Sequence, residues 1–126
     1  MFPDGLARAA LERYRSIFGG ELELHSGDTM RPDGSAALVQ HGILSGPVRL
    51  YGADAEPGDS ALPMQGLHLA LLGTADRATL HEWFDALAED GDVIAPLEPR
   101  PWGASDGQVV DRYGVRWLVG YEHDAQ

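Results

Sequence analysis

Two halves of this chain repeat each other at nearly one spacing, and that repeat constrains the fold more than any other feature. A shift of 69 residues places Leu11 on Leu80, Tyr14 on Trp83 and Phe18 on Leu87. A shift of 68 residues places Gly46 on Gly114, Leu50 on Leu118 and Gly52 on Gly120. Chance explains any single pair, but it explains the whole set at nearly one offset less well. The matches therefore indicate one folding unit used twice.

Each half is expected to contain one helix and several strands. Apolar residues recur every three or four positions along 6–18, which predicts a helix that Asp4 caps and Gly19–Gly20 end. Thr74 or Asp76 is expected to cap a second helix in the later half. Alternating or continuous apolar runs predict the strands, which are 21–25, 36–44, 48–53, 67–72, 93–94, 108–112 and 115–121.

These elements predict an α+β fold in which one domain, 1–126, holds two βαβββ modules. Module one spans about 1–54, module two spans about 66–123, and the segment 55–65, with its prolines and glycine, links them. The first strand of module one is expected to be truncated, because the counterpart of His68 falls just ahead of Met1. A truncated strand leaves an open sheet edge, and since exposed edges are usually covered, we expect a homodimer.

Charge and composition exclude several classes of function. The formal net charge of −11 repels phosphate backbones and anionic lipids, which argues against nucleic-acid and membrane partners. The absence of cysteine excludes disulfides and thiolate metal sites. Neither a secretory signal nor an apolar run of about 20 residues is visible, so we expect a cytoplasmic protein. No nucleophile motif and no phosphate-binding glycine loop is present.

Three segments carry a resemblance to a known family. All three resemble segments of the PhnB-like branch of the vicinal oxygen chelate (glyoxalase/bleomycin-resistance-like) superfamily. Phe18–Leu22 resembles the end of the first helix of that branch, and Trp83–Gly91 resembles its second helix. Trp102–Trp117 resembles its closing loop and hairpin. The resemblance covers nearly the whole chain. It implies two half-barrel sheets around a small-molecule cavity. It also implies a divalent metal that is often held by a His or Gln and a carboxylate from each module.

The residues at those metal-ligand positions differ from the family pattern. His68 matches the histidine of the second module, and its counterpart in the first module would precede Met1. The two carboxylate positions fall on Leu50 and Leu118. One imidazole does not hold a catalytic divalent ion, so we expect no metal and no cofactor. The paired leucines instead predict an apolar cavity floor.

Six residues are candidates for the ligand pocket. Leu50 and Leu118 are two of them, on the floor. His68 is the third, and it either ligates a metal, hydrogen-bonds a ligand, acts as acid or base, or is structural. Trp102 either covers a ligand or caps the core, and Arg116 either meets an anionic ligand or lies on the surface. The sixth candidate is His41, on a strand whose face the sequence leaves open. His25, His81 and His123 are expected to be solvated.

These observations favour a metal-independent small-molecule-binding protein with an unidentified ligand. One alternative is a metal-dependent lyase, isomerase or dioxygenase with an atypical or partner-completed site. Another is a non-catalytic dimeric module with a vestigial cavity. Metal analysis separates the second function from the others, and ligand-dependent stabilisation separates the first from the third.

Overall fold

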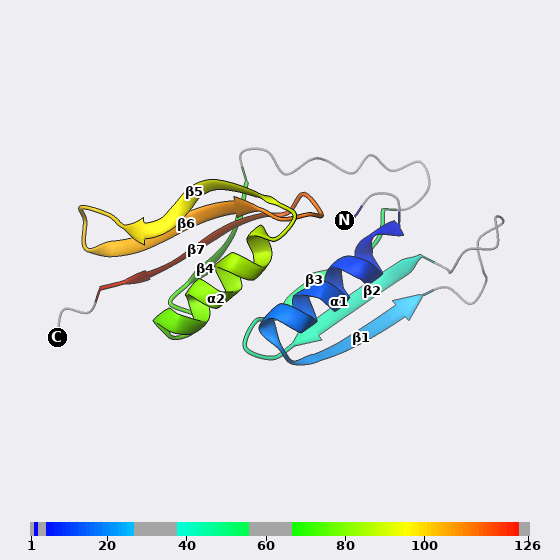
Figure 1. The fold of residues 1–126 in the computed structure, drawn as a ribbon. Helices are drawn as coiled ribbons and strands as arrows, with labels where there is room; N and C mark the ends of the chain where they lie inside the picture. The colour runs from blue at the N-terminus through cyan, green and yellow to red at the C-terminus, as the bar shows by residue number, and fades with distance from the viewer. Residues whose placement is uncertain (1, 3–4, 27–37, 56–66, 124–126) are drawn as a thin grey trace. The chain divides into compact units, whose positions relative to one another are not determined.

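The computed structural model describes residues 2, 5–26, 38–55 and 67–123, and it divides the chain into two compact units, 1–62 and 63–126. We call them unit 1 and unit 2 and describe each by itself (Figure 1). The division falls within the segment 55–65 expected to link the modules. Each unit contains one helix and one open sheet, so the expected α+β class is confirmed. No helix in these described ranges is both long and apolar enough to cross a membrane.

Unit 1 is a helix packed on a three-stranded antiparallel sheet. The helix α1 (Ala7–Phe18) precedes β1 (Glu21–Ser26), β2 (Val39–Ser45) and β3 (Leu50–Gly52), which pair in the order β1-β2-β3. Figure 1 shows α1 lying across this sheet, and it contacts β1 and β2. The helix buries one stripe, as its apolar spacing predicts. That stripe consists of Ala7, Ala10, Leu11, Tyr14 and Phe18.

The two ends of α1 are fixed in different ways. Gly19 and Gly20 end it with φ values of 79° and 104°, which confirms the predicted termination. The expected cap, Asp4, lies outside the described residues. The first backbone N–H of α1, that of Ala7, donates to Asp54 Oδ1 at 2.8 Å, and the Val39 N–H donates to Asp54 Oδ2 at 2.8 Å. A buried carboxylate after β3 therefore ties the helix start to β2.

Ahead of α1, one of the described residues pairs with the segment that follows β3. Phe2 forms a parallel bridge with Asp54, in which the Phe2 N–H donates to the Ala53 carbonyl and the Ala55 N–H donates to the Phe2 carbonyl, both at 2.8 Å. In unit 2 the corresponding place holds a full strand, β4 (Leu69–Leu72), which is parallel to β7 (Arg116–Glu122).

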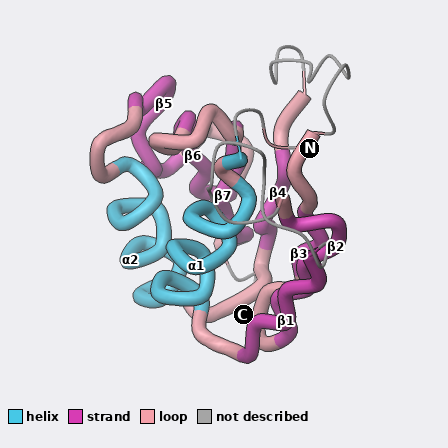
Figure 2. Tube along the Cα trace, turned by 90° about the vertical axis from the view of Figure 1, so that its right-hand side faces the viewer, coloured by secondary structure: helices cyan, strands magenta, loops and turns pink. Residues whose placement is uncertain are grey.

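Unit 2 has a longer sheet with the order β4-β7-β6-β5, in which β5 (Asp92–Pro99), β6 (Ala104–Val110) and β7 are antiparallel. The helix α2 (Arg77–Ala88) packs on β5, β6 and β7 (Figure 2). Asp76 caps it by accepting the Thr79 N–H at 2.8 Å, which confirms one of the two predicted caps. The core between helix and sheet is buried, and its members are Leu80, Trp83, Phe84, Leu87, Val109, Trp117 and Val119.

Two strands of unit 2 are longer than the sequence predicts. The short strand expected at 93–94 continues through Pro96 to Pro99. This strand, β5, lies at the edge of the sheet, and its register with β6 is irregular at two points. An edge strand with bulges tolerates proline, since the missing N–H faces away from the ladder. The strand expected to begin at Gln108 begins at Ala104. The glycines and polar residues of this stretch are typical of a loop, but they pair with the far end of β7.

Candidate functional site

Unit 2 contains a pocket of about 860 Å³ at the place where β4 ends and α2 begins. Its walls come from the β4–α2 connection, from the start of β6 with the turn before it, and from β7. The lining residues are Leu72, Gly73, Ala75, Asp76, Arg77, Trp102, Ala104, Ser105, Asp106, Leu118, Tyr121 and Glu122.

The apolar part of this pocket lies on the sheet face opposite α2, which we call the open face of unit 2. Leu118 pairs with Ala70 on one side and Gln108 on the other, and directly paired residues point to the same face. Its neighbours Trp117 and Val119 are fully buried toward α2. Leu118 is half-buried on the open face. Leu72, which is 56% exposed, shares that face through its alternation with Ala70.

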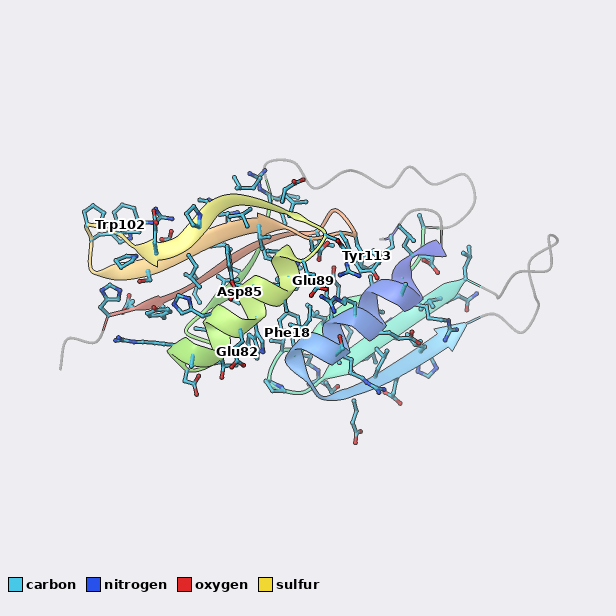
Figure 3. The ribbon with its side chains drawn as sticks, in the orientation of Figure 1. Phe18, Glu82, Asp85, Glu89, Trp102 and Tyr113 are labelled. Carbon is cyan, nitrogen blue, oxygen red and sulfur yellow. The ribbon has the colours of Figure 1, made fainter. Side chains whose placement is uncertain are left out.

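Trp102 is the most exposed large apolar side chain in the described ranges, at 70%. It lies at the turn between β5 and β6, as Figure 3 shows, and it lines the pocket. Gly103, the next residue, has a φ of 87°, a backbone conformation that permits this tight turn. Trp102 is therefore a largely exposed indole at the pocket.

A polar cluster forms the wall toward α2. The Arg77 guanidinium lies over the Tyr121 ring at 5.3 Å, and the Tyr121 hydroxyl is 3.0 Å from His81 Nε2. Beside them, Ser105 Oγ is 2.7 Å from His123 Nε2. His123 is half-buried, so the prediction that it is solvated is wrong. These contacts hold the helix start and the end of β7 in fixed positions around the pocket.

Three carboxylates also line the pocket, so the site is more polar than the sequence predicts. Asp106 is bound by Arg100 Nε at 3.0 Å, whereas Glu122 is exposed at the end of β7. Hydrogen bonds from Thr79, first from its side chain and then from its backbone N–H, hold the pKa of the Asp76 carboxyl below its usual value. The expectation of an apolar floor describes only the part around Leu118 and Leu72.

The structure separates the six candidate pocket residues into three groups. Leu118 and Trp102 line the pocket. Arg116 is half-buried two positions before Leu118, and His68 is exposed just before β4, but neither is part of the lining. His41 and Leu50 belong to unit 1. His41 is exposed on the face of its sheet that points away from α1.

Leu50 does not hold the position that the sequence repeat predicts. It pairs with Leu44, which is fully buried, so its side chain points toward α1. The registers align the pair Leu44–Leu50 with the pair Val109–Trp117, because each of these pairs faces its own helix. The counterpart of Leu118 is therefore Tyr51. The repeat fails at this hairpin because equivalent residues are 65 positions apart at Leu44 and Val109 and 67 positions apart at Tyr51 and Leu118, whereas the repeat predicts 68.

The residues at the metal positions of the family do not fit a divalent ion. His68 is exposed and lies ahead of the strand, and Leu118 offers no donor. In the described ranges, no three His, Asp, Glu or Cys side chains gather closely enough to hold a metal. A catalytic divalent ion in proteins requires three or more such ligands. We therefore derive no chemical step through a metal at this place.

Sequence reasoning missed the polar residues of the pocket. Arg77 and Tyr121 meet only through the fold, and no local signal in the sequence joins them. Strand alternation could have identified Glu122 and Asp106. Glu122 lies four residues beyond Leu118, on the same face of β7, and Asp106 lies on the same face of the neighbouring strand β6, opposite Gly120. The sequence prediction starts this strand at Gln108, four residues after the observed start at Ala104, and therefore leaves Asp106 outside it.

Comparison with known proteins places this architecture in a family. Residues 2–119 match the model of the Glyoxalase/Bleomycin resistance protein/Dioxygenase superfamily. The crystal structure of protein PA1353 from Pseudomonas aeruginosa is 33% identical with a TM-score of 0.81, over 98% of this chain and 95% of that one.

Two further structures share the fold at lower identity. The PhnB protein from Bacillus cereus, described as a putative 3-demethylubiquinone-9 3-methyltransferase, is 21% identical with a TM-score of 0.69, over 98% of this chain and 95% of that one. TioX from Micromonospora sp. ML1 is 17% identical with a TM-score of 0.59, over 96% and 94%. No protein with a curated description matches. The family match over residues 2–119, with a similar solved structure over nearly the whole chain, shows that the chain belongs to the glyoxalase/bleomycin resistance protein/dioxygenase superfamily.

Proposed function

We propose that this protein binds a small organic molecule in the pocket of unit 2 and does so without a metal ion. The observation that carries the proposal is the exposed Trp102 at a pocket of about 860 Å³. Ligand pockets commonly enclose about 300 to 1,000 Å³ and combine apolar walls with a few polar groups. Leu72 and Leu118 supply the apolar wall here, and Arg77 and Tyr121 supply polar groups.

The indole of Trp102 is 70% exposed, so it offers a ligand apolar surface to cover. Covering about 100 Å² of its surface with an apolar ligand is worth on the order of 2 kcal/mol, at about 25 cal/mol per Å². The ring also offers a flat face for stacking or for a cation. The fixed wall of Arg77, Tyr121 and His81 lowers the ordering cost of binding, because these side chains already hold one another.

The donor set supports metal independence. A leucine stands at the second-module carboxylate position, and the single matching imidazole, His68, lies outside the pocket lining. Binding would therefore use apolar contact and hydrogen bonding. We expect that treatment with EDTA leaves the affinity for a ligand unchanged.

Nile red, a neutral apolar dye, tests the proposal. We expect one dye per chain, with the fluorescence enhancement that follows entry into an apolar site. Trp102→Ala should weaken binding roughly tenfold, the equivalent of about 1.4 kcal/mol. Tyr51→Ala is the matched control, because Tyr51 is a similarly exposed aromatic residue in unit 1, at 62%.

Three results would overturn the proposed function. They are absence of dye binding, equal losses in the Trp102 and Tyr51 variants, and dye binding that requires an added metal. The affinity of EDTA-treated protein decides the last of these directly.

We also propose that the chain acts as a homodimer in the cytoplasm. In the described part of unit 1, Phe2 alone pairs along the outer edge of the β3 segment, and an edge left open in this way is usually covered. Light scattering at micromolar concentration should give twice the mass of one chain. A monomer would contradict the assignment.

A further inference from the structure

The sheet of unit 1 places two histidines directly opposite each other. His25 on β1 and His41 on β2 are partners in the antiparallel register. The adjacent pair, Leu24 and Gly42, faces α1, since a Cβ at Gly42 would meet the Leu11 side chain at 2.5 Å. The two imidazoles therefore lie on the opposite face, where both are exposed. Their ring centroids are 6.2 Å apart, with an interplanar angle of 24°.

We propose that His25 and His41 together bind one late divalent transition-metal ion, with Cu²⁺ preferred over Ni²⁺ and Zn²⁺. Neutral imidazole is the commonest metal ligand in proteins, and divalent ions follow the order in which Cu²⁺ binds tightest. The site differs in position from the metal set of the family, whose second-module positions here are His68 and Leu118. The histidine pair belongs to unit 1, whereas the residues that line the proposed pocket belong to unit 2.

The separation of the rings suits one shared ion. Metal–imidazole nitrogen distances of about 2.0–2.1 Å keep the centroids of two rings on one ion roughly 4.5 to 6.3 Å apart, depending on the angle at the metal. The observed 6.2 Å lies at the upper end of that window, and the rings are stacked, so both rings must turn to present a nitrogen to one ion. Directly opposed residues have Cβ atoms about 4.5–5.5 Å apart, so the strands need not move. Exposed side chains change rotamer at small cost, and a rotation of the rings turns their nitrogens toward a common point.

The surroundings favour a cation at this pair. Glu23 precedes His25 by two residues on the same face and is exposed, so its carboxylate adds negative potential. The three rings of His25, His41 and Tyr51 lie next to one another in that order. The guanidinium of Arg49 lies beside the last of them, 5.9 Å from the Tyr51 ring centroid. Tyr51 in turn stacks 6.0 Å from His41, which limits the directions that His41 can take. The formal net charge of −11 raises the local concentration of cations around the whole chain.

An ion at this position would link β1 to β2. The sheet described in unit 1 has three strands, and a crosslink between two of them stabilises it through preferential binding of the ion to the folded form. The melting temperature should therefore rise with the metal concentration.

Titration of the full chain with Cu²⁺ tests the site. We expect one ion per chain by calorimetry, and two imidazole nitrogens on it by pulsed electron paramagnetic resonance. His25→Gln and His41→Gln should each weaken binding by roughly tenfold or more, because the second ligand no longer acts at its effective concentration. His68→Gln is the control, since His68 is an exposed histidine of unit 2, and it should leave the affinity unchanged.

The outcomes separate cleanly. Fewer than two imidazole nitrogens on the bound Cu²⁺ of the unmodified chain overturns the proposal, and this measurement does not depend on any variant folding. Equal losses in the His68 variant and the His25 variant also overturn it. A rise in melting temperature with Zn²⁺ in the unmodified chain that is lost in the double variant supports it.

Discussion

The two units follow one plan but fasten it with different side chains. In both, a glycine after the helix touches the end of the central strand: a Cβ at Gly20 would lie 2.3 Å from the Ser45 carbonyl oxygen, and a Cβ at Gly91 would lie 2.3 Å from that of Val110. The buried carboxylates differ. In unit 1 Asp54 ties the helix start to β2, whereas in unit 2 Asp111 closes the last hairpin. The repeat therefore preserves backbone contacts more strictly than polar ones.

The open faces of the two sheets differ in the same way. Where unit 2 has Leu118 at its pocket, unit 1 has Tyr51 beside a histidine pair. The equivalent positions thus carry an aliphatic side chain in unit 2 and, in unit 1, an aromatic side chain that stacks on His41. Backbone geometry fixes the position of a side chain, and the residue at that position fixes what it binds.

Asp111→Ala should cause the largest loss of stability and should act on unit 2. The Asp111 carboxylate accepts the Tyr113 N–H at 2.9 Å, the Val115 N–H at 3.0 Å and the Trp117 indole N–H at 2.9 Å. Leaving buried donors such as those of Val115 and Trp117 unpaired costs about 3 to 4 kcal/mol in unfolding free energy. Urea unfolding followed by tryptophan fluorescence measures this loss, because all three tryptophans lie in unit 2. A loss below about 1 kcal/mol would show that water replaces the carboxylate.

Asp54→Ala should cause a smaller loss and should act on unit 1. Its carboxylate holds two backbone donors, those of Ala7 and Val39, and we expect a loss of about 2 to 3 kcal/mol. Far-ultraviolet circular dichroism is the measurement, since unit 1 contains no tryptophan. Asp54→Asn is the control, because one amide oxygen can still accept a single N–H and should retain part of the stability. Equal losses in the two variants would contradict this assignment.

Gly20→Ala tests whether the shared glycine contact matters. The added methyl group would meet the Ser45 carbonyl at 2.3 Å, and the φ of 104° disfavours any side chain, so we expect a loss of about 2 kcal/mol. Gly19→Ala is the matched control. Gly19 also has a positive φ, 79°, but no atom lies within 4 Å of its Cβ, so only the conformational cost of about 1 kcal/mol applies. Denaturant midpoints of the two variants should differ in this order, and similar midpoints would assign the effect to backbone conformation alone.

The sequence predicts the helices better than the hairpins, and the reason is local. Helix periodicity and the Asp76 cap depend on neighbouring residues, so the paired positions Leu11 and Leu80 are both buried as the repeat requires. The face of Leu50 depends on the lengths of the loops before it, and these loops set the offset at the last strand to 67 residues, one less than the 68 that the repeat predicts. A shift of one residue in a strand moves every side chain to the opposite face.

The candidate site was less predictable than the fold for the same reason. Trp102 and Leu118 stand out in the sequence because of their type and spacing. The cluster of Arg77, Tyr121 and His81 joins α2 to β7, and residues so far apart along the chain meet only once the sheet has formed.

Loss of the Asp76 cap of α2 should have the smallest effect on stability among these predictions, and this effect should depend on pH. The cap of α2 is the exposed Asp76, whose carboxyl pKa is lowered by hydrogen bonds from Thr79. A carboxyl whose pKa is lower in the folded state contributes stability above its unfolded value of 3.8, and this contribution is lost as the pH falls through the folded pKa. Asp76→Asn keeps a capping oxygen but does not titrate, so its stability should fall less steeply below pH 3.8 than that of the unmodified chain. Glu82→Gln removes an exposed carboxyl on the same helix (Figure 3) and is the control for the loss of one negative charge. Urea midpoints measured from about pH 6 to about pH 2 give both slopes. If the Asp76 and Glu82 variants follow the same curve, the Asp76 cap does not contribute to the acid sensitivity of unit 2.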